Sequence, residues 1–190
     1  NSWQVGTSTT NNAFYTAFGA SGAIIGDTLY YYGGASGGSF GAKQFMRKGS
    51  INPSDPTDIA WELMDNAPGD PSYRAACSTN GNTVFWVGGS PVSYNYDGIA
   101  YDGSGGVDPS ARVMHFNQDL YSYGEDVNQP YGVMDLRGIA KLSNNRWIIC
   151  GGMDSTQTVS TRTFLLENNS LELSSLPSNN FQLKEFEDHF

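Results

Sequence analysis

The sequence has few of the residues that several classes of protein require. Among its 190 residues are two cysteines and two histidines, and its 10 lysines and arginines are outnumbered by 19 acidic residues, for a net charge of −9. Two cysteines do not make a disulfide framework. Proteins bind a nucleic-acid backbone with clusters of lysine and arginine, which this chain lacks, so we expect no nucleic-acid partner.

Long apolar runs are also missing. No stretch approaches the roughly 18 to 20 apolar residues that a membrane helix needs, so we expect no membrane span. The chain does not open with a basic segment followed by an apolar one, as a signal peptide does. Its low lysine content, with abundant Asn, Ser, Thr, Gly and aromatic residues, is typical of secreted proteins, and we expect an extracellular or cell-surface location.

What the chain has in quantity is glycine and aromatic residues: 23 Gly, 11 Tyr, 10 Phe and 4 Trp. Aromatic residues favour strands, and glycine favours the tight turns between them. The composition therefore predicts many short strands and an all-β fold.

One phrase occurs three times. Arg74–Gly89 reads as an extended run of small residues, a turn at Asn80-Gly81 and a dense apolar strand that ends on two glycines. An Asn-Gly pair between two such runs is a strong signal for a β-hairpin. The phrase returns at Arg137–Gly152 and, more weakly, at Gly19–Gly34, each time with the first of the two glycines fourteen positions after the first residue. Three aligned hairpins indicate a repeat architecture.

The repeated hairpin with its double glycine resembles the kelch motif. The double glycines begin at positions 33, 88 and 151, which are 55 and 63 residues apart, and kelch repeats of about 50 residues each form one four-stranded propeller blade. The resemblance implies an all-β, kelch-type propeller segment of three four-stranded antiparallel blades. It also places Trp61, Tyr121 and Tyr123 on outermost strands.

We expect the segment to be divided into an orphan outer strand of a preceding blade, three blades and a tail. The corresponding ranges are residues 1–10, 17–66, 72–127, 135–176 and 177–190. For the second blade the third strand is either 98–101 or 113–116, and for the third blade the outer strands are 161–166 and 170–173. Three blades do not close a ring, since propellers have four to eight. We therefore expect a fragment or mature product whose ring is completed by further blades or by a partner protein.

Arg74 and Arg137 are long cations that open two of the repeats at equal offsets from the double glycines. In kelch-like propellers that serve as substrate adaptors, arginines at the matching place ring the channel mouth and take acidic ligands. The resemblance thus implies a ligand site at Arg74 and Arg137 for an acidic peptide or a glycan. The alternative is that each arginine pairs with an acidic residue of the next blade.

Three further positions are candidates for modification or ion binding. Asp102 and Asp108 lie in a glycine-rich stretch with alternating oxygen ligands, where a structural Ca²⁺ would bind, with a solvated loop as the alternative. Asn168 begins an Asn-Asn-Ser sequon and is a glycosylation candidate.

Neither the cysteines nor the histidines predict a catalytic metal. Cys77 and Cys150 are expected to be small buried thiols, with a disulfide as the alternative. Galactose-oxidase-like propellers hold copper with two histidines and a Cys-linked tyrosine, whereas His115 and His189 lie far apart in this sequence and in no matching motif. We expect no transition metal.

These observations favour a secreted or cell-surface propeller module, with a binding or structural role, that recognises a protein or a glycan through its loops and channel mouth. The alternative is a carbohydrate-active propeller enzyme that resembles kelch-type sialic-acid mutarotases. A carboxylate that faces the arginines across the channel would separate the two, and the sequence does not identify one.

Overall fold

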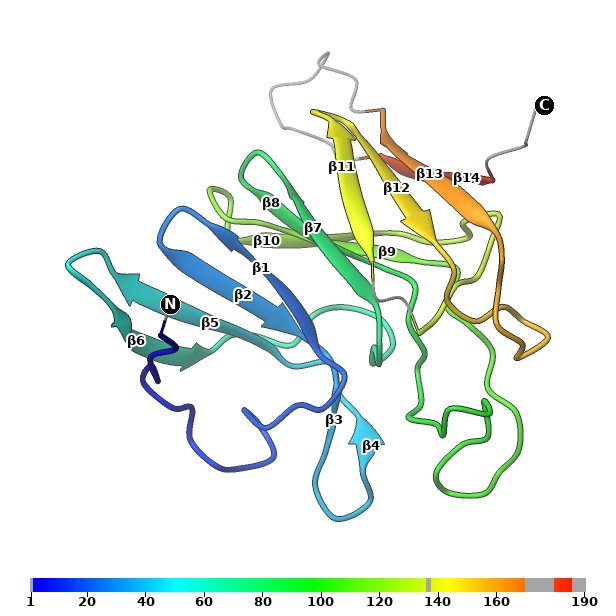
Figure 1. Ribbon diagram of the computed structural model, residues 1–190, viewed down its shortest axis with the longest axis horizontal. Coiled ribbons are helices and arrows are strands. Elements are labelled where there is room, and N and C mark those ends of the chain that lie inside the picture. The colour runs from blue at the N-terminus through cyan, green and yellow to red at the C-terminus, as the bar shows by residue number, and fades with distance from the viewer. Residues whose placement is uncertain (1, 136–137, 170–179, 186–190) are drawn as a thin grey trace.

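The computed structural model describes residues 2–135, 138–169 and 180–185. These residues form three four-stranded antiparallel sheets and one two-stranded hairpin, arranged side by side like the blades of a propeller (Figure 1). The first blade contains β1 (Ser21–Ile25), β2 (Thr28–Tyr32), β5 (Met46–Asn52) and β6 (Asp55–Leu63). The second contains β7 (Ala76–Asn80), β8 (Thr83–Val87), β9 (Val113–Asn117) and β10 (Ser122–Asp126). The third contains β11 (Ile139–Ser143), β12 (Arg146–Cys150), β13 (Thr163–Asn168) and β14 (Phe181–Glu185). The small hairpin consists of β3 (Ala35–Ser36) and β4 (Gly41–Ala42).

The three predicted hairpins are confirmed as the two innermost strands of each blade, β1–β2, β7–β8 and β11–β12. Each pair is joined by a two-residue turn, and Gly26 and Gly81 have positive φ of 56° and 55° in the first two turns. The favoured two-residue hairpin turns use a positive φ, which glycine adopts without steric cost. The turn glycines of the sequence thus favour the first two pairings, whereas the third turn, Asn144-Asn145, has no residue with positive φ.

The first two double glycines join their blades to the next. In all three pairs both glycines have positive φ, between 66° and 88°. The amide of Gly34 donates to the carbonyl of Ser72 at 2.7 Å, and that of Gly89 donates to the carbonyl of Val133 at 2.8 Å. Ser72 and Val133 both lie on the segments that enter the following blade. A Cβ on Gly33 or Gly88 would collide with the same two carbonyls, so only glycine lets the chains approach this closely.

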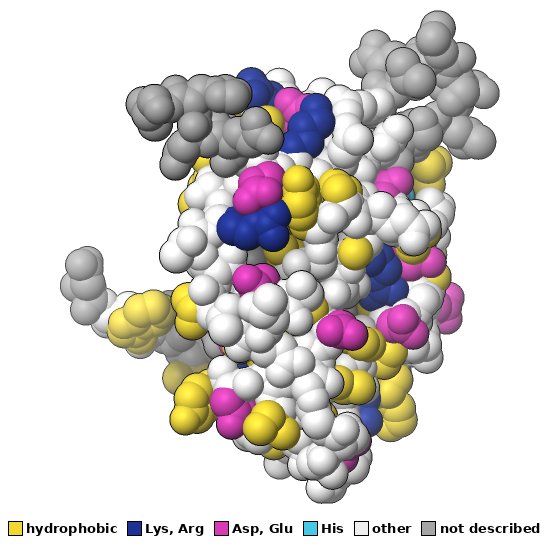
Figure 2. Space-filling view, turned by 90° about the vertical axis from the view of Figure 1, so that its right-hand side faces the viewer, with side chains coloured by type: hydrophobic (Ala, Val, Ile, Leu, Met, Phe, Trp, Pro, Cys, Tyr) yellow, Lys and Arg dark blue, Asp and Glu magenta, His cyan; other side chains and the backbone are white. Residues whose placement is uncertain are grey.

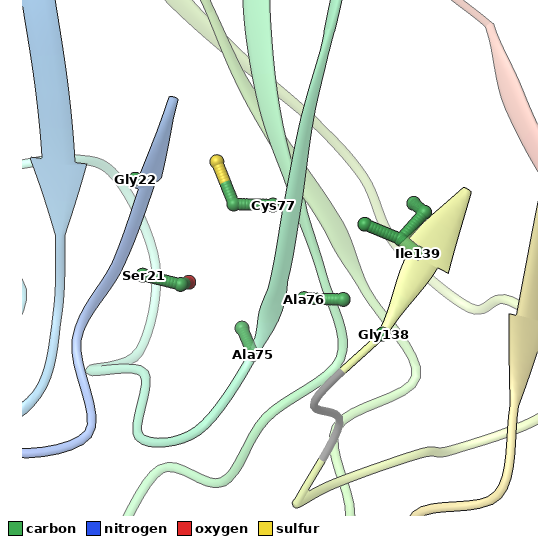
Figure 3. A pocket seen from close by; sticks show the side chains of 7 residues that line it. All are labelled: Ser21, Gly22, Ala75, Ala76, Cys77, Gly138 and Ile139. Atoms are coloured by element: carbon green, nitrogen blue, oxygen red, sulfur yellow. The ribbon is translucent and has the colours of Figure 1, made fainter. Parts of the chain in front are cut away.

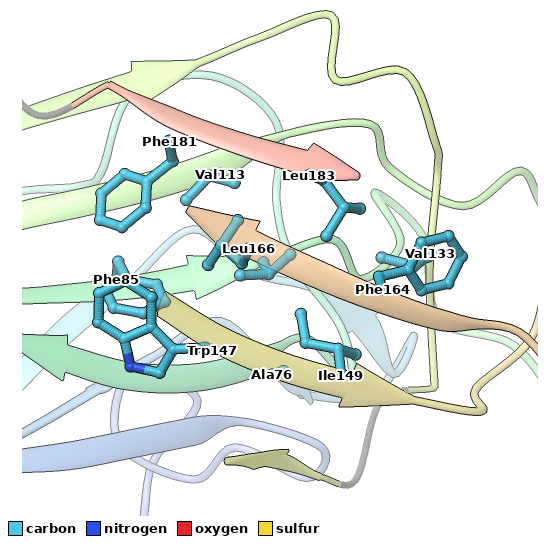
Figure 4. Close-up of a cluster of buried hydrophobic side chains, with 11 residues drawn as sticks. Ala76, Phe85, Val113, Val133, Trp147, Ile149, Phe164, Leu166, Phe181 and Leu183 are labelled. Atoms are coloured by element: carbon cyan, nitrogen blue, oxygen red, sulfur yellow. The ribbon is translucent and has the colours of Figure 1, made fainter. Parts of the chain in front are cut away.

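The hydrophobic core lies between the blades. Every residue of strand β8 is buried. Because successive side chains of a strand point in opposite directions, both faces of β8 are therefore covered. Trp86 packs with Tyr32 and Met114 between the first and second blades. On the other face, the Phe85 ring lies 4.8 Å from that of Trp147 and 4.6 Å from that of Phe181 (Figure 4). The dense apolar strand of the second repeat is thus the centre of both interfaces.

The outermost strands agree with expectation in the first two blades and differ in the third. Trp61 lies on β6 and Tyr123 on β10, while Tyr121 lies in the turn just before β10. The third strand of the second blade is β9, at the later of the two predicted positions. In the third blade the fourth strand is β14, within the range expected to be a tail, so the predicted boundary at residue 176 is wrong. The predicted strand at 170–173 lies outside the described residues.

The described residues 2–10 form no strand with the rest of the described chain, and their place in a preceding blade stays a prediction. Instead, this segment follows the outer edge of the first blade. The amide of Thr7 donates to the carbonyl of Thr57 at 2.7 Å, and the Trp61 indole donates to the carbonyl of Thr7 at 2.7 Å. The segment makes these isolated contacts in place of a regular ladder, which a strand requires.

A helix able to cross a bilayer is not present among the described residues.

His115 provides a test of the inter-blade packing. It lies on β9 opposite Gly124, and its ring is 5.8 Å from that of Phe181. Burial lowers the pKa of this histidine to about 4, although the Glu125 carboxylate opposes the shift. Because the unfolded chain has the ordinary histidine pKa of about 6.5, it binds more protons than the folded chain between those two values. Stability should therefore fall as the pH falls from 6.5 towards 4.

We expect the midpoint of thermal unfolding to decrease from pH 7 to pH 5, and the decrease to be smaller in His115→Gln. The comparison stops at pH 5 because the carboxylates of Glu167 and Glu185, whose pKa values are lowered by their basic partners, contribute below that range. An equal pH dependence in the wild type and the variant would contradict a buried, neutral His115.

Candidate functional site

A cavity of about 410 Å³ lies between the innermost strands of the three blades, where a propeller has its central channel (Figure 3). Its wall consists mainly of small residues, which fit where inner strands converge: Ser21, Gly22, Ala75, Ala76, Cys77, Gly138 and Ile139. Burial raises the pKa of the Cys77 thiol, which keeps it protonated. The Ser21 hydroxyl is buried and has no hydrogen-bond partner within the described part of the chain.

At the mouth of this channel the three blades place different residues at one equivalent position. Phe18, Tyr73 and Met134 each form a β-bridge to the residue that follows a double glycine. The next residues are Gly19, Arg74 and Asp135, and all three have a left-handed backbone, with φ of 72°, 59° and 55°. This conformation is uncommon for residues with a side chain and often marks functional sites.

Arg74 is held among these neighbours. Its guanidinium forms an ion pair with Asp135 at 2.8 Å, and the two side chains are only 10% and 18% exposed. It also lies 4.9 Å from the ring centroid of Tyr73, 5.2 Å from that of Tyr94 and 5.8 Å from that of Phe18. A side chain at Gly19 would collide with Tyr73, so glycine at the first position leaves room for the arginine at the second.

Three polar atoms around the Arg74 guanidinium are buried: the phenol oxygens of Tyr73 and Tyr94 and the Nε of Arg74. Within the described residues none of them makes a well-aligned hydrogen bond, although both phenols interact with Arg74 and Tyr73 also interacts with Tyr101. Burial raises the pKa of both phenols, which keeps them protonated. Buried polar groups normally make well-aligned hydrogen bonds, so these three incompletely bonded groups make the mouth a candidate site for an oxygen acceptor.

Aromatic rings extend this site to the surface. Phe18 is 57% exposed and Tyr101 is 44% exposed, and Phe40 lies between them with its ring 5.7 Å and 5.0 Å from theirs. We call the seven residues at this position the mouth cluster: Phe18, Phe40, Tyr73, Arg74, Tyr94, Tyr101 and Asp135. They come from three blade entries, the β3–β4 hairpin and the β8–β9 loop.

The structure corrects the equivalence of the two predicted arginines. Strand β11 has an irregularity between Lys141 and Ser143, where the register of its pairing with β12 shifts. As a result, Ile139 occupies the strand position that Cys77 occupies in the second blade. The alignment of Arg74 with Arg137 would instead place Ala140 there, one residue later. Arg137 itself lies outside the described residues. At the position equivalent to Arg74 the third blade has Asp135, and the Arg74–Asp135 pair matches the alternative of an acidic partner from the next blade.

Two further ion pairs were not apparent from the sequence. Arg112 and Arg162 each lie just before the third strand of a blade, and each pairs with a glutamate of the fourth strand: Arg112 with Glu125 at 3.2 Å, and Arg162 with Glu185 at 2.6 Å. The spacing of the repeats does not indicate this equivalence, because Arg112 lies 24 residues after Gly88 and Arg162 lies 11 residues after Gly151. On the face that Figure 2 shows, basic and acidic side chains of the described residues lie side by side and form no basic patch.

The remaining predicted residues are dispersed. Asp102 Oδ1 accepts a hydrogen bond from the amide of Ser104 at 2.9 Å, and the described residues contain no group of three His, Cys, Asp or Glu side chains placed to hold a metal. Asn168 is only 4% exposed and its Oδ1 accepts from the amide of Asn180, so it is not an accessible glycosylation site in this fold. Cys77 and Cys150 are both free thiols, and Cys150 is exposed, contrary to expectation.

Comparison with known proteins supports the fold. No family model matches the chain, and no curated protein matches its sequence. Among the solved structures that resemble it is one described as the structure of YjhT, with a TM-score of 0.59 and 13% sequence identity. The similarity covers 87% of this chain and 51% of that structure, so the chain spans about half of its length. The fold is that of a kelch-type propeller, and similarity at this level of identity shows the fold alone.

The ion pair between Arg74 and Asp135 can be measured by a double-mutant cycle. Removing one partner of a buried pair costs about 3–5 kcal/mol, because it leaves an uncompensated charge. We expect Arg74→Gln and Asp135→Asn each to lower the free energy of unfolding by about 3 kcal/mol, and the double variant to lose clearly less than the sum. Both replacements keep a Cβ at the left-handed position, so the backbone strain stays similar.

Lys48 and Glu62 form an exposed pair at 3.1 Å and serve as the matched control. The corresponding cycle of Lys48→Gln and Glu62→Gln should show a coupling below about 1 kcal/mol. Additive losses at Arg74 and Asp135 would contradict a direct interaction between them.

Proposed function

We propose that this chain belongs to a secreted or cell-surface propeller module that binds a protein or a glycan at the mouth cluster. The observation that carries the proposal is the set of buried polar groups around Arg74 that lack a well-aligned hydrogen bond, next to the exposed rings of Phe18 and Tyr101. An oxygen acceptor of a ligand would satisfy the donors, while Phe18 and Tyr101 would contribute apolar contact. Rigid aromatic side chains and arginine are the residue types that carry most binding energy at interfaces.

The chemistry of the site supports binding over proton transfer. A general acid or base acts best with a pKa near neutral pH, whereas burial raises the pKa of Tyr73 and Tyr94. Asp135 faces Arg74 and already serves as its ion-pair partner. Among the described residues that line the channel, Cys77 is the one titratable group, and burial keeps it protonated. The Asp135 carboxylate facing Arg74 is the feature that the alternative of a carbohydrate-active enzyme requires, but because it already serves as the ion-pair partner of Arg74 we favour binding.

We also propose that further propeller blades pack against the free face of the third blade. Tyr30 and Phe85 lie three residues before a double glycine and are covered by the following blade. The equivalent residue of the third blade is Ile148, which is half-buried, and on the same face Leu142 is 54% exposed. The same chain or a partner protein would supply the missing blades.

The binding proposal is tested with an array of neutral oligosaccharides, oligogalacturonate and a hexaglutamate peptide. We expect at least one probe to bind, and Phe18→Ala and Tyr101→Ala each to weaken that binding roughly tenfold, the usual effect of truncating a central aromatic contact. Leu120→Ala is the control, because Leu120 is 45% exposed and lies in the β9–β10 turn at the opposite end of the strands. Binding that no variant affects, or that Leu120→Ala weakens equally, would contradict the mouth cluster as the binding site.

A further inference from the structure

A groove of about 340 Å³ lies beside the mouth cluster, between the β3–β4 hairpin and the β8–β9 loop. Ser39, Gly41 and Ala42 line one wall, and Val92, Ser93 and Asp102 line the other. The two walls are fixed to each other, because the buried Ser93 hydroxyl donates to the carbonyl of Phe40. The hairpin is in turn attached to its blade, since the amide of Lys43 donates to the carbonyl of Gly34 at 2.9 Å. The groove is therefore largely preorganised, which lowers the entropic cost of binding.

The polar groups of the groove are an acceptor on one wall and donors on the other. Asp102 interacts with the Ser104 hydroxyl and accepts from the Ser104 amide, and these hydrogen bonds lower the pKa of its carboxyl, so the exposed Asp102 remains an ionised acceptor. None of the ion pairs of the described residues includes Asp102. Opposite it are the exposed Ser39 hydroxyl and the Lys43 ammonium, which lies close to Gly41.

Apolar surface completes the groove. Pro91 and the 43% exposed Val92 form a patch on the loop wall. Tyr101, directly before Asp102, carries the aromatic surface of the mouth cluster to the rim of the groove. A ligand that fits must therefore combine an apolar face with several hydroxyl groups that both donate and accept hydrogen bonds.

We propose that this groove binds one sugar unit of a neutral glycan. The C–H face of the ring would lie against Val92 and Tyr101, with hydroxyl groups on Asp102, Ser39 and Lys43. A neutral glycan fits better than an acidic one, because the ionised Asp102 repels anions. It also fits better than a protein surface, since the volume is at the small end of the range for ligand pockets, whereas a stable protein interface buries about 800 Å² on each partner.

This inference rests on the proposed function and narrows its ligand class. The probes are cellohexaose, laminarihexaose, mannohexaose and galactohexaose, with oligogalacturonate and hexaglutamate as the acidic sugar and the peptide. Binding is measured by isothermal titration calorimetry and stability by thermal unfolding. We expect at least one neutral hexasaccharide to bind more tightly than both acidic probes.

The variants come in matched pairs. Asp102→Asn keeps the acceptor for the Ser104 amide but loses the charge, and should weaken binding of the neutral probe tenfold to a hundredfold. Asp97→Asn is its control, because Asp97 makes the same local turn, with its Oδ1 accepting from the Ile99 amide at 3.3 Å, yet does not line the groove. Gly41→Tyr fills the groove and should abolish binding. Gly38→Tyr, on the open side of the same hairpin, should not.

The outcomes separate the two proposals. Loss of binding in Phe18→Ala and Tyr101→Ala, with full binding in Asp102→Asn and Gly41→Tyr, would overturn the groove and leave the mouth cluster as the binding site. Tightest binding of hexaglutamate or oligogalacturonate would overturn the neutral-glycan assignment. Equal losses in Asp97→Asn and Gly38→Tyr, or an unfolding midpoint lowered in the groove variants alone, would attribute the effect to structure and also overturn the inference.

Discussion

The backbone contact between each of the first two double glycines and the next blade is the constraint on which the rest of the structure depends. The amides of Gly34 and Gly89 donate to the carbonyls of Ser72 and Val133, so the end of one hairpin fixes the entry of the next blade. Such hydrogen bonds contribute only about 1 kcal/mol each to net stability. Their geometric effect is larger, because they hold consecutive sheets at the separation at which their apolar faces interdigitate. The aromatic core around Phe85 follows from this spacing.

The same contact also creates the mouth of the channel. Directly after the fixed carbonyl, the chain of each blade passes through a bridge residue and then a left-handed residue, so side chains from successive blades converge at one level. Glycine, arginine and aspartate occupy this level in the three blades. Because Gly19 leaves space and Asp135 supplies the opposite charge, Arg74 is held against Tyr73 without an external ligand. The site is thus a preformed surface whose incompletely bonded groups are donors.

The arginines of this fold have two kinds of partner, backbone carbonyls for the buried Arg47 and carboxylates for Arg112 and Arg162. Arg47, the most deeply buried of the described arginines, has no carboxylate partner in the described residues and donates instead to the carbonyls of Phe14 and Gly33. Burial lowers its pKa to about 10, and it remains charged at neutral pH. Arg112 and Arg162 connect the third and fourth strands of their blades. Most of the few cations in this acidic chain therefore stabilise the scaffold, and Lys43 is a rare one left beside a groove.

Sequence alone determined the repeat, the hairpins and the all-β fold, because turn residues and strand periodicity are local and because double glycines mark a backbone that other residues cannot adopt. It also predicted the small residues of the inner strands. It did not predict the irregularity in β11, which a gapless alignment of Arg74 with Arg137 cannot reveal, nor the position of β14. The partner of Arg74 and the groove beside Tyr101 depend on contacts between residues 50 or more positions apart in the chain. Those contacts exist only once the blades pack, and so the tertiary structure alone decided them.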